Sequence, residues 1–146
     1  CAVMAVVCGV ILGVESTGWD GGSDFDDGPK MRQIINGLGA PLLVAVFDIA
    51  HAVIQGLDLR QSIRDLGDLI GHVHIHDNKG QTDDHLALGA GTIRFETAYA
   101  ALLEIGYDRS FTLELESLNR GYTADILIEN RDSILRGMGR HDATRE

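Results

Sequence analysis

The strongest constraint on the fold is that short apolar runs and helix-like segments alternate four times along the chain. The runs are apolar throughout, which is typical of strands that helices cover in a parallel α/β sheet. Four such units, at a spacing of about 30 residues, correspond to half of an eight-stranded βα (TIM) barrel of about 250 residues. The expected strands span residues 10–14, 42–47, 69–75 and 110–115, and the expected helices span 29–38, 59–66, 95–105 and 122–136.

The start of the chain indicates that it is part of a longer protein. It begins with Cys1 rather than Met and continues directly into apolar sequence. We therefore expect residues 1–146 to form a single partial domain, the C-terminal half of the barrel with its last four βα units. With 45% hydrophobic and 23% charged residues, the composition is globular and excludes disorder of the whole chain.

Charge and hydropathy argue against two kinds of partner, and cysteine usage indicates the compartment. Twelve Lys+Arg against 22 Asp+Glu give a net charge of −10, and an acidic surface argues against a nucleic-acid partner. The apolar stretch 1–14 lacks a basic leader and is too short to span a bilayer, so we expect no membrane partner. Cys1 and Cys8 have no CxxC spacing, which indicates reduced thiols and a cytoplasmic protein.

Residues of metal-binding types stand at or near the C-terminal ends of all four expected strands. Because these ends meet on one face of a parallel barrel, where active sites are built, we expect the side chains to converge. One carboxylate at a strand end carries little information, since loops begin with polar residues. Its recurrence, as Glu, Asp or His, at all four strands indicates a site. Three carboxylates and one imidazole favour Mn²⁺, Mg²⁺ or Co²⁺, while Zn²⁺ with O/N ligands remains compatible. The four residues are Glu15, Asp48, His74 and Glu114.

Three histidines at alternate positions, His72, His74 and His76, share one face of the expected third strand. We expect His74 to be a metal ligand. His72 lies deeper in the barrel, where we expect a hydrogen-bonded core histidine rather than a ligand. His76 lies nearest the mouth of the barrel, where it would contact substrate or solvent.

Two further pairs of residues could add ligands to the site. Asp48 and His51 lie one helical turn apart and converge on one ligand or on adjacent metals; alternatively, Asp48 caps a helix and His51 is a polar surface residue. Asp83 and His85 alternate in the loop 78–91, where they form a second O/N pair or belong to an acidic surface loop. The glycines of this loop would let its backbone approach the site closely.

Five segments carry a family resemblance when they are taken as a set, although each is weak alone. They are VESTGWD (14–20), FDIAHA (47–52), HVHIHDN (72–78), DDHLALGAG (83–91) and GYDRSFTLELE (106–116). In order and spacing they resemble the xylose isomerase-like TIM-barrel superfamily, which includes sugar-phosphate isomerases/epimerases and endonuclease IV. The match corresponds to strands five to eight of that barrel and covers nearly the whole chain.

The resemblance implies roles for individual residues. A single metal would be held by Glu15, Asp48, His74 and Glu114. His51 would contact substrate in an isomerase or bind a further metal in a nuclease, and Asp83 and His85 would complete that further site. Two positions depart from the family pattern and leave the substrate open: His76 stands where lysine-like residues are common, and Ala90 replaces an acidic residue.

The function implied by the resemblance is that of a metal-dependent sugar or sugar-acid isomerase/epimerase with a small sugar-derived substrate; the resemblance is also compatible with a homo-oligomer. The metal would polarise a carbonyl, and Glu15 and Glu114 would remove and return the proton on the adjacent carbon through an enediolate intermediate. The alternatives are an endonuclease IV-like phosphodiesterase acting at apurinic sites, a dehydratase or lyase on the same barrel, and a degenerate barrel that only binds. The −10 charge argues against the nuclease.

Overall fold

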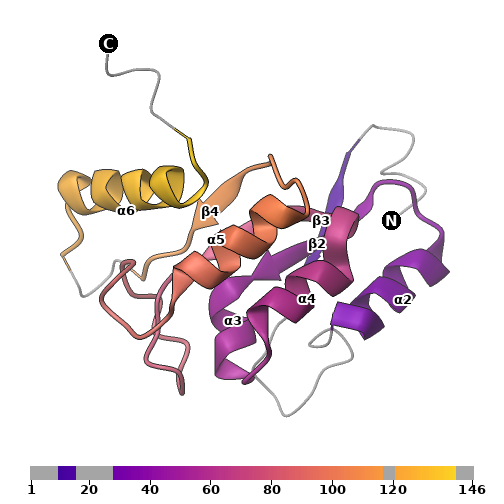
Figure 1. Ribbon diagram of the computed structural model, residues 1–146, viewed down its shortest axis with the longest axis horizontal. Helices are drawn as coiled ribbons and strands as arrows, with labels where there is room; N and C mark the ends of the chain where they lie inside the picture. Colours follow the sequence, from indigo (N-terminus) through magenta and orange to yellow (C-terminus); the bar gives the residue numbers. More distant parts are fainter. Residues whose placement is uncertain (1–9, 16–27, 117–120, 141–146) are drawn as a thin grey trace.

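Four parallel strands form a single sheet, in the order in which they occur along the chain (Figure 1). The computed structural model describes residues 10–15, 28–116 and 121–140, so Cys1 and Cys8 lie outside the described residues. Each strand is followed by a helix, and the arrangement is that of part of a βα barrel, as the alternating sequence predicted. The strands are β1 (Leu12–Glu15), β2 (Leu43–Asp48), β3 (Ile70–Ile75) and β4 (Phe111–Leu113).

The helices α2, α4 and α5 pack side by side over one face of the sheet, and α6 follows β4 (Figure 1). One short helix, α3, was not among the expected helical ranges, although a helix capped by Asp48 was one of the two alternatives for that residue. Within the described ranges, no helix has both the length and the hydropathy that crossing a bilayer requires. The helices are α2 (Gly28–Leu38), α3 (Ile49–Ile54), α4 (Leu59–Leu66), α5 (Phe95–Glu104) and α6 (Ala124–Gly137), with a 3₁₀ turn η1 (Gly67–Leu69) before β3.

The hydrophobic core lies between the sheet and the helices. Phe47 of β2 and Val73 and Ile75 of β3 are buried in it. Successive side chains of a strand point to opposite faces, so His72 and His74 lie on the other face of the sheet, where both are partly exposed. The core therefore leaves this second face to the polar residues.

The predicted strand boundaries differ from the observed ones by up to two residues, and the difference at β4 bears on the site. The strand was expected over residues 110–115, but it spans Phe111–Leu113. The ladder nevertheless continues by one bond, because the backbone N–H of Glu114 donates to the carbonyl of Ile75 at 3.1 Å. Glu114 therefore keeps a fixed place at the strand end although it lies outside the strand.

Strands β2 and β3 approach so closely at Gly71 that no larger residue fits. A methyl group there would overlap the side chain of Val44. We expect Gly71→Ala to lower the free energy of unfolding by about 1–3 kcal/mol, as overpacked sites do, measured by urea denaturation. Gly37→Ala is the control, since the space around Gly37 in α2 is open and alanine favours helices. Equal stability of Gly71→Ala and the wild type would contradict the observed strand packing.

Candidate metal centre

The four predicted ligands lie together at one edge of the sheet. Glu15 and Asp48 end β1 and β2, His74 is the next-to-last residue of β3, and Glu114 follows β4. Because the strands are parallel and in chain order, these positions share one edge. One ligand atom from each of the four residues lies within 4.8 Å of the others. The convergence expected from the sequence is therefore observed, and these atoms can surround one metal ion.

His74 lies between two carboxylates that come from opposite edges of the sheet. Its Nδ1 atom is 3.0 Å from Oε1 of Glu15 and 3.1 Å from Oε1 of Glu114. The hydrogen bond with Glu15 raises the pKa of His74, which outweighs the opposing effect of burial, and the negative charge of Glu114 adds to the rise. A positive charge is therefore favoured at this point.

Asp48 is the most deeply buried of the four, and one of its oxygens lacks a hydrogen bond. Oδ1 accepts the backbone N–H of His51 at 2.8 Å and so caps α3. Oδ2 has no hydrogen-bond partner among the described residues, although it is fully buried. Burial alone would raise the pKa of Asp48, but His76 and His51 outweigh it and lower the pKa. Asp48 is thus a buried anion with an oxygen directed at the site, which suits a cation ligand.

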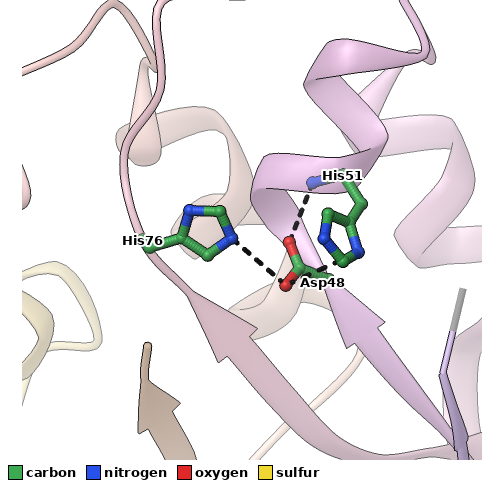
Figure 2. Close-up of side chains that lie close together, drawn as sticks. All are labelled: Asp48, His51 and His76. Atoms are coloured by element: carbon green, nitrogen blue, oxygen red, sulfur yellow. Dashed lines mark hydrogen bonds and ion pairs between the residues drawn. The ribbon is translucent and has the colours of Figure 1, made fainter. Parts of the chain in front are cut away.

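Asp48 and His51 combine parts of the two alternatives that the sequence left open. Asp48 is the helix cap, while His51 is not a surface residue, because only 14% of its side chain is exposed. His51 Nδ1 lies 3.7 Å from Glu15 Oε1 and 3.8 Å from Asp48 Oδ2. Figure 2 shows the imidazole of His51 beside the carboxylate of Asp48, with His76 on the other side. The cap therefore brings His51 into the site.

His76 directly follows β3 at the strand ends, but the predicted contact with solvent is wrong. Its side chain is 0% exposed. Nε2 lies 3.5 Å from Asp48 Oδ2 and 3.4 Å from Asp83 Oδ1 (Figure 2 shows the first of these contacts), and its ring stacks on that of His85 with centroids 4.0 Å apart. The alternation of faces ends with β3 at Ile75, and the following loop covers His76. Burial alone would lower the pKa of His76, but the two carboxylates raise it.

His72 lies below the metal-ligand candidates and is hydrogen-bonded, as predicted. Nδ1 is 3.0 Å from the hydroxyl of Ser110 and Nε2 is 2.6 Å from that of Thr112. Its ring meets that of His74 edge-on at 5.3 Å. Burial, followed by the charge of His74, lowers the pKa of His72. The side chain is partly exposed rather than part of the hydrophobic core, which is where the prediction was wrong.

Asp83 and His85 belong to the site rather than to an acidic surface loop. Asp83 Oδ2 lies 3.3 Å from His51 Nε2 and 3.0 Å from His85 Nε2. The loop between β3 and α5 thus folds back over the strand ends. Two further groups in this area can hold an ion: Asp48, His51 and His76 form one, and His76, His85 and Glu114 form the other.

The backbone of His85 is in the left-handed region, with φ at 46°, which is uncommon for a residue with a side chain. The conformation is held by a contact of 3.0 Å between Nδ1 of His85 and the carbonyl of Glu114. Neighbouring Leu88 donates its N–H to Oδ1 of the buried Asn130 in α6 at 2.6 Å. Asn130 was not predicted, since a single polar residue in a helix is a weak signal. Strain maintained in this way is typical of functional sites.

The site carries more negative charge than nearby cationic side chains balance. It gathers the carboxylates of Glu15, Asp48, Asp83 and Glu114, and in the described part of the chain none of them forms an ion pair with Lys or Arg. An open cavity of about 450 Å³ adjoins the cluster and is lined by His85, Glu114, Leu115 and Glu116. That volume is in the range of small-molecule sites. The arrangement can therefore hold a cation beside a space for a small ligand.

Comparison with known proteins agrees with the observed fold. The sequence model of the family described as xylose isomerase-like TIM barrel matches residues 1–137. An uncharacterised protein of Methanocaldococcus jannaschii is 35% identical over 61% of the chain and 31% of its own length. Fructoselysine 3-epimerase of Escherichia coli O157:H7 is 28% identical over 54% of the chain and 29% of its own length. The crystal structure of a D-tagatose 3-epimerase-like protein is 25% identical, with a TM-score of 0.79 over 94% of the chain and 50% of its own length. The chain thus spans about a third of these relatives and half of this structure.

Proposed function

Because the chain belongs to the xylose isomerase-like TIM-barrel family, we propose that it forms the metal-binding half of a divalent-metal-dependent sugar or sugar-acid isomerase/epimerase. The observation that carries the proposal is the convergence of one candidate ligand from each of the four strand ends. The resemblance to a fructoselysine 3-epimerase and to a D-tagatose 3-epimerase-like protein supports epimerisation of a ketose as the first reaction to test.

The donor set fits a divalent ion. Glu15, Asp48, His74 and Glu114 offer three carboxylates and one imidazole, and the buried Oδ2 of Asp48 lacks a hydrogen bond among the described residues. Carboxylate-rich sets favour Mn²⁺, Mg²⁺ or Co²⁺, and Zn²⁺ is the alternative for O/N ligands. When bound, such an ion polarises a carbonyl group and makes the hydrogen on the adjacent carbon more acidic.

Proton transfer is assigned to Glu15 and Glu114. They come from the two edge strands, and both contact Nδ1 of His74, at 3.0 and 3.1 Å. Carboxylates placed on two sides of a substrate can remove a proton from one face and return it to the other, which inverts the carbon. His51, with its ring nitrogens near Glu15 and Asp83, would orient a hydroxyl group. The substrate would be a small sugar or sugar derivative in the adjoining cavity.

A second candidate function is a phosphodiesterase of the endonuclease IV type. One observation favours it: besides the four strand-end residues, Asp48, His51 and His76 form a group that could hold a further ion, and so do His76, His85 and Glu114. The net charge of −10 and the lack of a Lys or Arg ion-paired with the site's carboxylates, as far as the structure describes the chain, disfavour a polyanionic substrate. A dehydratase or lyase would begin with the same proton removal.

Two assays on the full-length protein separate these reactions. The protein is loaded with Mn²⁺, Mg²⁺, Co²⁺ or Zn²⁺ and incubated with candidate ketoses in D₂O, and in parallel with a DNA duplex that contains one abasic site. We expect deuterium at the epimerised carbon and no strand cleavage. Cleavage without deuterium incorporation would contradict the epimerase, and deuterium incorporation accompanied by loss of water would indicate the dehydratase.

A further inference from the structure

The loop between β3 and α5 brings Asp83 and His85 into the site, yet residues 78–92 contain no helix or strand. Long irregular loops of this kind are commonly functional and need anchors to hold one conformation. We propose that Asp77, at the start of the loop, is the positioning residue that fixes the loop over the site. The inference rests on the proposed function in so far as Asp83 and His85 act on the substrate.

The carboxylate of Asp77 collects four backbone N–H groups of the loop. Oδ1 accepts from Asn78 at 2.8 Å and from Ile93 at 3.1 Å. Oδ2 accepts from Gly89 and from Gly91, each at 2.9 Å. Asn78 lies at the beginning of the loop, whereas Gly89, Gly91 and Ile93 lie near its end, before α5. A single side chain therefore joins the beginning of the loop to its end.

The backbone of Asp77 makes a further pair of bonds to the same loop. Its N–H donates to the carbonyl of Leu86, and the N–H of Leu86 donates to the carbonyl of Asp77, both at 2.8 Å. Leu86 directly follows His85. These two bonds set the distance between the end of β3 and the residue that stacks on His76.

Close packing at Gly91 shows how tightly the loop is held against this carboxylate. A methyl group at Gly91 would overlap the carboxylate of Asp77 and the carbonyl of Asn78. Asn78 continues the anchorage, because its side-chain amide donates to the carbonyl of Ala50, next to His51, at 3.0 Å. The anchor therefore connects the loop to α3 as well as to β3.

The carboxylate of Asp77 is occupied by the loop and does not point into the candidate metal site. Its side chain is fully buried, and both oxygens are directed at the loop's backbone. The four candidate metal ligands lie at the strand ends and do not belong to the loop. Release of the loop should therefore displace the side chains of Asp83 and His85 from the site while leaving metal binding at the strand ends intact.

The test compares Asp77→Asn and Gly91→Ala with Asp58→Asn in the full-length protein. Asparagine has the shape of aspartate but turns an N–H₂ group toward two of the backbone donors, which leaves them without an acceptor. Gly91→Ala disturbs the same contact between Asp77 and the loop, because the added methyl group overlaps the carboxylate of Asp77. Asp58 is the control, because its carboxylate also accepts a backbone N–H, from Gln61 at 2.9 Å, but at the exposed start of α4.

We expect hydrogen exchange at the amides of Gly89, Gly91 and Ile93 to become at least about tenfold faster in both loop variants, as the loss of a buried hydrogen bond implies. Exchange at Ile63, in the core of α4, should stay close to that of the wild type. Metal content should not change, and kcat/KM for the sugar should fall by about 100-fold, the effect of a misplacement of about 1 Å. Asp58→Asn should change none of these loop signals.

The outcomes separate this inference from the proposed function, because exchange and metal content require no turnover. Unchanged exchange at the three loop amides would overturn the inference whatever the activity. If both loop variants accelerate exchange at Ile63 as much as in the loop, or fail to fold, Asp77 supports the whole fold and the inference is also wrong. Fast loop exchange with unchanged kcat/KM would show that the loop is anchored but not needed for the reaction, which overturns the positioning role.

Discussion

Glu114→Gln and Glu15→Gln are each expected to lose nearly all exchange between a carbon-bound substrate proton and solvent deuterium. Glutamine keeps the shape and an oxygen that can still coordinate a metal, but it cannot accept and return a proton. General acid–base catalysis typically contributes about 10²–10⁴-fold, so the exchange rate should fall by that factor. The fall should greatly exceed any loss of substrate affinity, because binding does not depend on proton transfer. The measurement is deuterium incorporation by NMR, with substrate affinity from titration calorimetry.

Glu104→Gln is the matched control for these two variants. Glu104 ends α5 and pairs with Arg60 and Arg64 on the exposed surface, away from the strand ends. Exposed ion pairs contribute little to stability, so this variant should exchange deuterium like the wild type. If Glu114→Gln and Glu15→Gln lose affinity and exchange in the same proportion, the two residues bind the substrate or the metal rather than transfer protons.

The second large effect is expected at His74. His74→Ala removes one of four candidate ligands and leaves Glu15 and Glu114 facing each other without the imidazole between them. Loss of a residue that only orients a ligand already costs 10–100-fold in metal affinity, so we expect a fall of at least about 100-fold. Metal content after dialysis should drop together with activity.

His72→Ala tests whether His74, rather than its neighbour on the same face of β3, binds the metal. His72 lies two residues earlier on the same face and bonds to Ser110 and Thr112 rather than to the carboxylates. We therefore expect His72→Ala to keep its metal, with a loss of stability of about 1 kcal/mol from the hydrogen bonds. Equal metal content in the two variants would show that His74 is not a ligand.

The parts of the site that follow from strand periodicity were predicted from the sequence, and the parts that depend on loops were not. His72 and His74 were correctly placed on one face of the sheet because both lie within β3, where side chains alternate. The burial of His76 was missed because the strand ends one residue earlier, so the alternation of faces no longer applies, and the following loop covers the side chain. The fold class was predictable for the same reason, since four apolar runs and their helices specify a parallel sheet.

Asp77 illustrates what single-sequence reasoning misses. Its partners, from Asn78 to Ile93, are backbone groups that carry no residue-specific signal. The glycines at 89 and 91 indicated close approach of a backbone, but not to which side chain. α3 stayed only an alternative, as the helix that Asp48 would cap, because six residues after a strand are too few to show a helical period.

The use of main-chain hydrogen bonds by Asp77 has a consequence for how proteins with this architecture can diverge. Backbone N–H groups are the same whichever side chain a residue carries, proline excepted. Positions such as Ala87 and Ala90 can therefore change without releasing the loop, provided that Gly91 remains small. The strand ends keep their own residues independently of these changes. Substitutions at such loop positions can thus leave both the Asp77 anchor and the four residues at the strand ends in place.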